Sequence, residues 1–156
     1  MLPSEKLRNE ISELYNINLE QYAWSEELKH QIFSTKLDKD LESNADTLED
    51  IYTLGYNIGH CGLTSRYVAR QFNEAKLFYG KAKLLVGTKS APNGEHAWTT
   101  INNFLIDTTL MICIPITEIT KLGYIPEKEI AHVNARLLSE YDRYDNDFEN
   151  NYRKKK

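Results

Sequence analysis

Apolar residues at steps of three and four dominate the first third of the chain. They recur along one helical face in two segments, near residues 4–14 and 24–32: Leu7, Ile11, Leu14, Leu28 and Ile32. Ser4 precedes the first stripe and is a candidate N-cap. The pattern predicts two amphipathic helices, followed by a polar connection over residues 34–46.

Two further helices are expected between residues 46 and 72. Asp46 or Thr47 can cap the first, which turns Leu48, Ile51, Tyr52 and Leu54 inward and ends at a glycine, Gly55. The second runs from Gly62 to Phe72, with Leu63, Tyr67 and Val68 at helical spacing. The region before the sheet is therefore predicted to be helical.

The pattern then changes to short segments rich in β-branched and aromatic residues. They predict strands at residues 75–79, 82–86, 95–101 and 104–114, with a turn-rich loop over residues 87–94. After Pro115 helix is expected to return, because Pro126 followed by acidic residues is typical of a helix N-terminus. Its apolar face is supplied by Ile130, Val133, Leu137, Leu138 and Tyr141.

The helical and strand segments predict an α+β chain, and its length predicts one domain over residues 1–150 followed by a basic tail over residues 151–156. At 156 residues it can bury a core without disulfide bonds, and 41% hydrophobic with 27% charged residues argues against disorder. The formal charge of −4 excludes bulk attraction to nucleic acid or anionic membrane. No apolar run is long enough to span a membrane and no signal peptide is visible, so a cytoplasmic location with reduced thiols is expected. A Cys61–Cys113 disulfide stays open as the less favoured alternative.

Three residues in the middle of the chain have the chemistry of a thiol nucleophile, its base and an orienting carboxylate: Cys61, His96 and Asp107. If Asn102 and Asn103 form a two-residue turn, Ile101 pairs with Phe104 and Trp98 with Asp107. His96 and Asp107 then share one face as diagonal neighbours about 7–8 Å apart, within side-chain reach. The spacing permits the two roles without requiring them.

Cys61 lies where a glycine-containing loop meets the predicted start of a helix. Unpaired amides at a helix N-terminus stabilise a thiolate and can also bind the oxyanion of an acyl-transfer intermediate. Gly59 and Gly62 flank the cysteine and leave room for a substrate carbonyl. The position therefore suits a nucleophile.

Cys61 leading a helix, His96-Ala97-Trp98 on a strand and Ile106-Asp107 on the next strand resemble the transglutaminase-like branch of the papain-like cysteine enzymes. The resemblance covers about residues 55–112. It implies a cysteine helix packed on an antiparallel sheet, with Cys61 as nucleophile, His96 as base and then acid, and Asp107 as orienting carboxylate. It also implies hydrolysis or transfer at a peptide, amide or related acyl bond of a protein, peptide or amide substrate, through a thioester and without a cofactor.

The chain departs from the papain-type pattern in having no glutamine shortly before the cysteine. Asn57, Tyr56 and the backbone at Cys61 and Gly62 are the remaining candidates to bind the oxyanion. Trp98 is expected to pack beside the histidine and to shield it from water. The loop at 87–94 is expected to border the substrate cleft.

Two alternatives belong to other classes of protein. One is a catalytically silent interaction module on the same fold, using the aromatic N-terminal helices. The other is a metal-binding regulator, which is less favoured because no Cys-x-x-Cys or His-x-x-x-His spacing is present, so no metal ligands are predicted. The substrate, the choice between hydrolysis and transfer, and the oligomeric state stay open.

Overall fold

The computed structural model describes residues 1–37, 46–72, 74–88 and 91–130. Within these ranges the chain forms helices α1 (Pro3–Tyr15), α2 (Glu26–Phe33), α3 (Leu48–Leu54) and α4 (Cys61–Gln71), then strands β1 (Lys76–Ala82), β2 (Glu95–Ile101), β3 (Phe104–Asp107), β4 (Ile112–Pro115) and β5 (Tyr124–Ile130). Short 3-10 turns at Leu19–Tyr22, Lys83–Leu85 and Ile116–Glu118 connect them. The predicted α+β class, helices first and an antiparallel sheet second, is confirmed.

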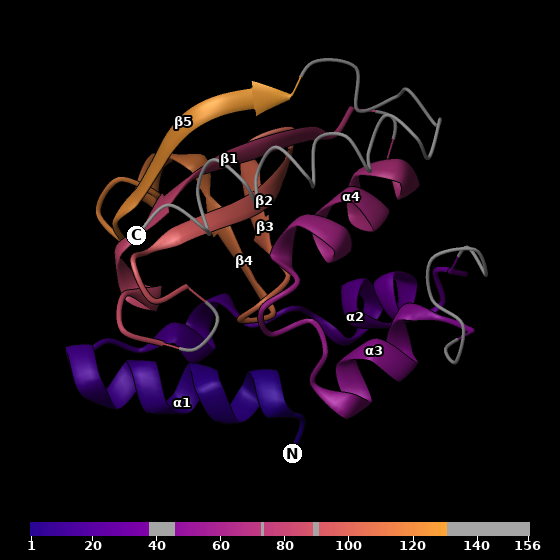
Figure 1. The fold of residues 1–156 in the computed structure, drawn as a ribbon, viewed down its shortest axis with the longest axis horizontal. Helices are drawn as coiled ribbons and strands as arrows, with labels where there is room; N and C mark the ends of the chain where they lie inside the picture. Colours follow the sequence, from indigo (N-terminus) through magenta and orange to yellow (C-terminus); the bar gives the residue numbers. More distant parts are fainter. Residues whose placement is uncertain (38–45, 73, 89–90, 131–156) are drawn as a thin grey trace.

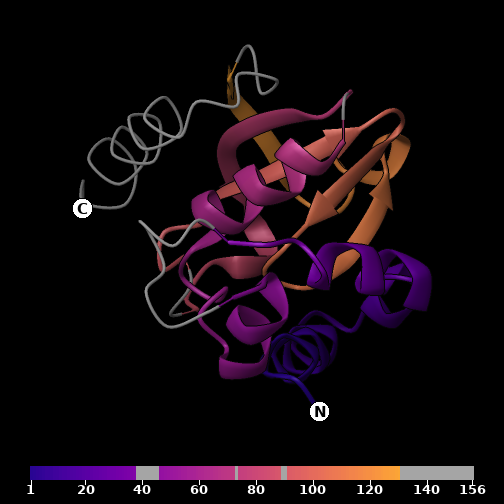
Figure 2. The ribbon, with the colours of Figure 1, turned by 90° about the vertical axis from the view of Figure 1, so that its right-hand side faces the viewer.

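The strands form a single antiparallel sheet in the order β4-β3-β2-β1-β5. β2, β3 and β4 follow one another as hairpins, whereas β5 crosses to the opposite edge and pairs with β1. Figure 1 shows α4 beside the sheet and α1 to α3 gathered at one end of it. In Figure 2, turned by 90°, the sheet lies above this helical end of the molecule.

Helix boundaries follow local chemistry. α1 begins at Pro3 after Leu2, so the predicted cap at Ser4 is wrong; Ser4 is buried inside the first turn. α3 begins after Thr47, whose backbone amide donates to Asp50 Oδ2, and it ends at Gly55 in the left-handed conformation, as predicted. Leu14 and Leu54 were expected to face the core but are 75% and 63% exposed, because each lies in the last turn of its helix.

Apolar side chains pack in three clusters around the sheet. One joins α1 to the face carrying Trp98, Leu105 and Tyr124. A second joins α2, α3 and α4 to Ile106 and Met111. The third surrounds Cys61 beneath β1 and β2. None of the helices in the described ranges has the length and apolar composition needed to span a bilayer.

The strand predictions hold in the middle of the chain and fail after it. β2 has the predicted bounds, but residues 104–114 are a β3–β4 hairpin with Met111 at φ 56, and most of 82–86 is a 3-10 turn. The helix expected from Pro126 is wrong, because that segment is the edge strand β5. Pro126 lies opposite Gly80 beside a register shift, and an edge strand tolerates proline because its outer N–H groups need no partner. The remaining predicted helix and the tail at 151–156 lie outside the described residues.

Candidate active site

His96 and Asp107 meet in the interior through the hairpin register expected from the sequence. Ile101 pairs with Phe104 and Thr99 with Ile106 across a turn in which Asn102 adopts φ 53. His96 Nε2 is 2.9 Å from Asp107 Oδ2, and both side chains are fully buried. A buried imidazole and carboxylate in contact fix each other's orientation.

The carboxylate of Asp107 is held at both oxygens. Oδ1 accepts the backbone amides of Thr109 at 2.8 Å and Leu110 at 2.9 Å. Oδ2 accepts the Tyr124 hydroxyl at 2.5 Å in addition to His96. Burial raises the pKa of Asp107, but His96 and these donors outweigh it and hold the pKa below its usual value. Asp107 is therefore ionised and rigidly oriented.

The imidazole of His96 is strongly basic. Burial lowers its pKa, but the Asp107 carboxylate and the Cys61 thiol, which act through charge and hydrogen bonding, raise the pKa to about 10. His96 Nε2 donates its hydrogen bond to Asp107. The other ring nitrogen, Nδ1, is buried without a well-formed hydrogen bond among the described residues. Nδ1 is thus the nitrogen left for the thiol, with a proton available to stabilise a thiolate.

Cys61 is the first residue of α4 and is fully buried. It packs near Tyr79 and Ala97 of β1 and β2, at the point where α4 approaches the sheet. Amides in the first turn of a helix have no intrahelical acceptor, so the N–H groups at Cys61 and Gly62 are suited to bind an oxyanion. Both Cys61 and Cys113 are free thiols, which rules out the alternative disulfide.

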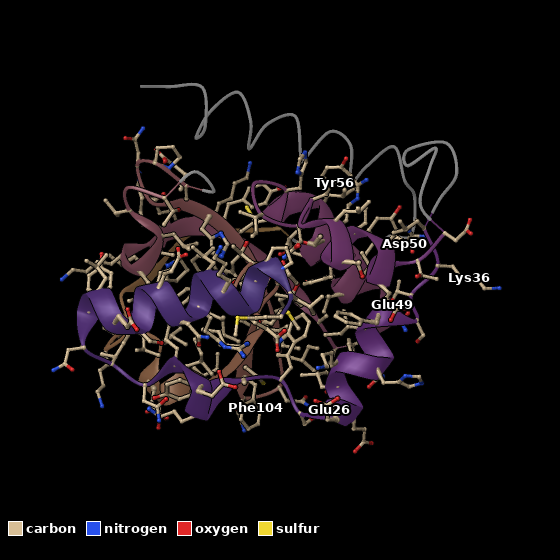
Figure 3. The ribbon with its side chains drawn as sticks, turned by 90° about the horizontal axis from the view of Figure 1, so that it is seen from below. Glu26, Lys36, Glu49, Asp50, Tyr56 and Phe104 are labelled. Carbon is tan, nitrogen blue, oxygen red and sulfur yellow. The ribbon has the colours of Figure 1, made fainter. Side chains whose placement is uncertain are left out.

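The two side-chain candidates for the oxyanion site are placed differently. Asn57 is buried, and its amide nitrogen donates to Ser4 Oγ at 2.6 Å and to the Thr108 carbonyl at 3.0 Å. The Asn57 NH2 group already has two acceptors in this arrangement, so it would have to exchange one of them to bind an oxyanion. Tyr56, labelled in Figure 3, is 58% exposed, and its carbonyl bonds His60 Nδ1 at 2.7 Å. The backbone of α4 is left as the donor source nearest the thiol.

Trp98 lies beside the histidine, as expected. Its ring is 6.1 Å from that of His96 and packs edge-on to Tyr124 at 5.4 Å. Trp98 is almost completely buried, so the indole excludes water from this side of the imidazole.

Thr108 and Tyr124 are site residues that the sequence reasoning missed. Thr108 Oγ1 is 2.6 Å from Thr64 Oγ1 in the first turn of α4, and the Thr108 carbonyl also accepts the Tyr52 hydroxyl at 2.8 Å. The Asp107 turn is thereby tied to the cysteine helix. The glycine before Tyr124-Ile125 was a turn signal that could have identified the strand start.

The triad is closed to solvent. Cys61, His96 and Asp107 each have no exposed surface, and none of them lines any of four surface cavities formed by the described residues. One cavity of about 490 Å³ lies between α1 and two segments that lead toward the site, at Ile58 and at Gly87 and Thr88. Gly87 and Thr88, at the start of the loop predicted to border the substrate cleft, therefore line the same cavity as Ile58, which lies three residues before Cys61.

Metal ligation has no supporting geometry in the described ranges, where no three histidine, cysteine or acidic side chains are grouped to hold an ion.

No family model, curated protein or solved structure matches this chain. Function is therefore inferred from the residues of the site alone.

Proposed function

We propose that the protein is a cysteine-dependent hydrolase or acyltransferase acting on a peptide, amide or related acyl bond. The observation that carries the proposal is the buried His96–Asp107 pair, whose remaining imidazole nitrogen has no well-formed partner while the Cys61 thiol contributes to the imidazole's basicity. Thiol, imidazole and carboxylate in this order are the parts of a nucleophilic triad. We also propose that the cysteine helix and the antiparallel sheet are arranged as in the transglutaminase-like enzymes.

In the proposed reaction the Cys61 sulfur attacks the substrate carbonyl carbon. His96 takes the thiol proton at Nδ1 and then gives it to the leaving amine, while Asp107 keeps Nε2 protonated and the ring oriented. The amides at the start of α4 bind the oxyanion that forms. Water resolves the thioester in a hydrolase, and an amine does so in a transferase. The reduced thiols fit a cytoplasmic protein whose substrate is a peptide, protein or amide.

Because all three groups are buried, the proposed reaction requires a change in conformation before substrate can bind. A substrate carbonyl can reach the sulfur only after the side chains that cover it move, as occurs in enzymes with gated sites. The same burial favours the second candidate function, a catalytically silent interaction module in which Cys61 is a core residue. The two candidates differ in whether Cys61 reacts in the native protein.

The decisive experiment compares thiol labelling and turnover in matched cysteine variants. Native protein is treated with iodoacetamide at neutral pH and assayed on peptide and amide libraries. We expect Cys61 to be labelled and turnover to vanish in Cys61→Ala, while Cys113→Ala keeps both. His96→Ala should slow the labelling of Cys61 in folded protein. Labelling at Cys61 only after denaturation would support the silent module instead.

A further inference from the structure

Tyr124 contributes a buried hydroxyl to the same carboxylate oxygen that binds His96. Tyr124 Oη is 2.5 Å from Asp107 Oδ2, and His96 Nε2 is 2.9 Å from that atom. Tyr124 is 1% exposed, and burial together with the Asp107 charge raises the pKa of its phenol well above the ordinary value. The phenol is therefore protonated at neutral pH and donates its hydrogen bond to Asp107.

The fold brings this hydroxyl to the site from β5, the strand at the opposite edge of the sheet from β4. Gly123 adopts φ +85, and a Cβ at this position would lie 2.5 Å from the Lys83 side chain, so glycine is required for the turn. Tyr124 then pairs with Ala82 as the first residue of β5, and its backbone amide bonds the Ile119 carbonyl at 2.9 Å. The tyrosine is thus rigidly anchored before its side chain reaches Asp107.

We propose that Tyr124 is a positioning residue of the triad: it acts through Asp107, holding Oδ2 beside His96 and sharing the negative charge of that oxygen. The inference rests on the proposed function of the triad. A hydroxyl hydrogen directed at a carboxylate disperses its charge and places positive potential near the imidazole. Tyr124 therefore keeps His96 less basic than the carboxylate alone would make it, which helps the imidazolium to release its proton to a leaving group.

Other titratable and charged groups lie near the His96–Asp107 pair, and one of them offers a matched control variant for Tyr124. They are the Cys61 thiol of α4 and the Tyr52 phenol of α3, while Arg8 of α1 bonds the carbonyls of Leu110 and Met111 in the same turn. Tyr52 is the closest match, because it too is a fully buried tyrosine, but its hydroxyl bonds the Thr108 carbonyl rather than the carboxylate.

The test is an NMR titration of the His96 ring in wild type, Tyr124→Phe and Tyr52→Phe, with the signal assigned by a His96→Gln variant. We expect Tyr124→Phe to raise the pKa of His96 by about half a unit or more, a threefold or greater gain in proton affinity. Tyr52→Phe should leave it close to the wild-type value. Because both variants lose one buried hydroxyl, a general loosening of the fold would move the two titrations alike.

An unchanged or lowered pKa of His96 in Tyr124→Phe would overturn the inference, as would an equal shift in Tyr52→Phe. The titration requires no turnover, so this outcome is separate from that of the proposed function, which fails if Cys61→Ala retains activity. Repeating the comparison in the Cys61→Ala background removes the thiol and should preserve the rise. Where turnover is measured, the alkaline limb of kcat/KM in Tyr124→Phe should move to higher pH in parallel.

Discussion

Replacing Asp107 by Asn tests the buried ion pair directly, because the side chain keeps its shape and loses its charge. The remaining amide oxygen can still accept from Thr109 and Leu110, which leaves the NH2 group facing His96 and Tyr124. Nε2 must then accept a hydrogen bond instead of donating one. The ring proton moves to Nδ1, the nitrogen assigned to the thiol, and the base is lost.

The magnitude follows from the pKa of His96. In the folded protein this pKa is about 10, whereas an unperturbed histidine titrates at 6.5. The difference corresponds to about 5 kcal/mol of stability. Since the folded pKa is the higher one, this contribution is complete below pH 6.5 and disappears as the pH rises from 6.5 to about 10. In Asp107→Asn the carboxylate no longer raises the pKa of His96, while burial still lowers it and only the Cys61 thiol still raises it, so most of the decline should disappear.

The assay is urea unfolding of both proteins at half-unit steps from pH 6 to pH 10. The free energy of unfolding of wild type should fall across this range relative to that of Asp107→Asn, which should also be the less stable protein at pH 6. Turnover in Asp107→Asn should fall by about 10⁴, as it does when the same exchange is made in a serine triad. Parallel stability curves for the two proteins would contradict this prediction, because they would mean that the pair is not ionised in the native state.

Two further predictions concern the scaffold around the site. Arg8→Met removes a buried guanidinium that donates to the Leu110 and Met111 carbonyls at 3.2 Å, and it should lower the free energy of unfolding in urea by about 1.5–3 kcal/mol; an unchanged midpoint would show that these bonds do not stabilise the turn. Gly80→Ala places a Cβ 2.1 Å from the Ile125 carbonyl oxygen, so β1 and β5 must separate and stability should drop by about 1–3 kcal/mol in thermal unfolding. A wild-type melting temperature in Gly80→Ala would contradict this close approach.

The sequence predicted the elements whose signals are local. The β2–β3 hairpin is specified by Asn102-Asn103 and by the alternation on either side of it, so the placement of His96 and Asp107 on one face could be derived from the sequence, and the structure adds their contact. The start of α4 was expected one residue late, at Gly62, because the glycines around Cys61 obscure the boundary. Local patterns were sufficient for this half of the candidate site.

Long-range pairing explains what was missed. The segment from Pro126 to Glu129 has helix-start chemistry, and only its pairing with β1 makes it a strand. Arg8 reaches the turn after Asp107 from the N-terminal helix and Tyr124 from the strand that crosses to the far edge of the sheet, and no local pattern encodes such contacts. Asn57 was a reasonable oxyanion candidate by position, but its hydrogen bond to Ser4 joins residues far apart in the sequence and could not be predicted from it.

The strand order has a consequence for how the protein matures during synthesis. β2, β3 and β4 can form as soon as they leave the ribosome, because each pairs with its neighbour in the chain, whereas β5 pairs with β1 across more than forty residues. Nascent chains that end before residue 124 can contain the thiol, the imidazole and the carboxylate yet lack the last hydroxyl donor to Asp107. The complete constellation would thus arise late in folding, when the final described strand closes the edge of the sheet.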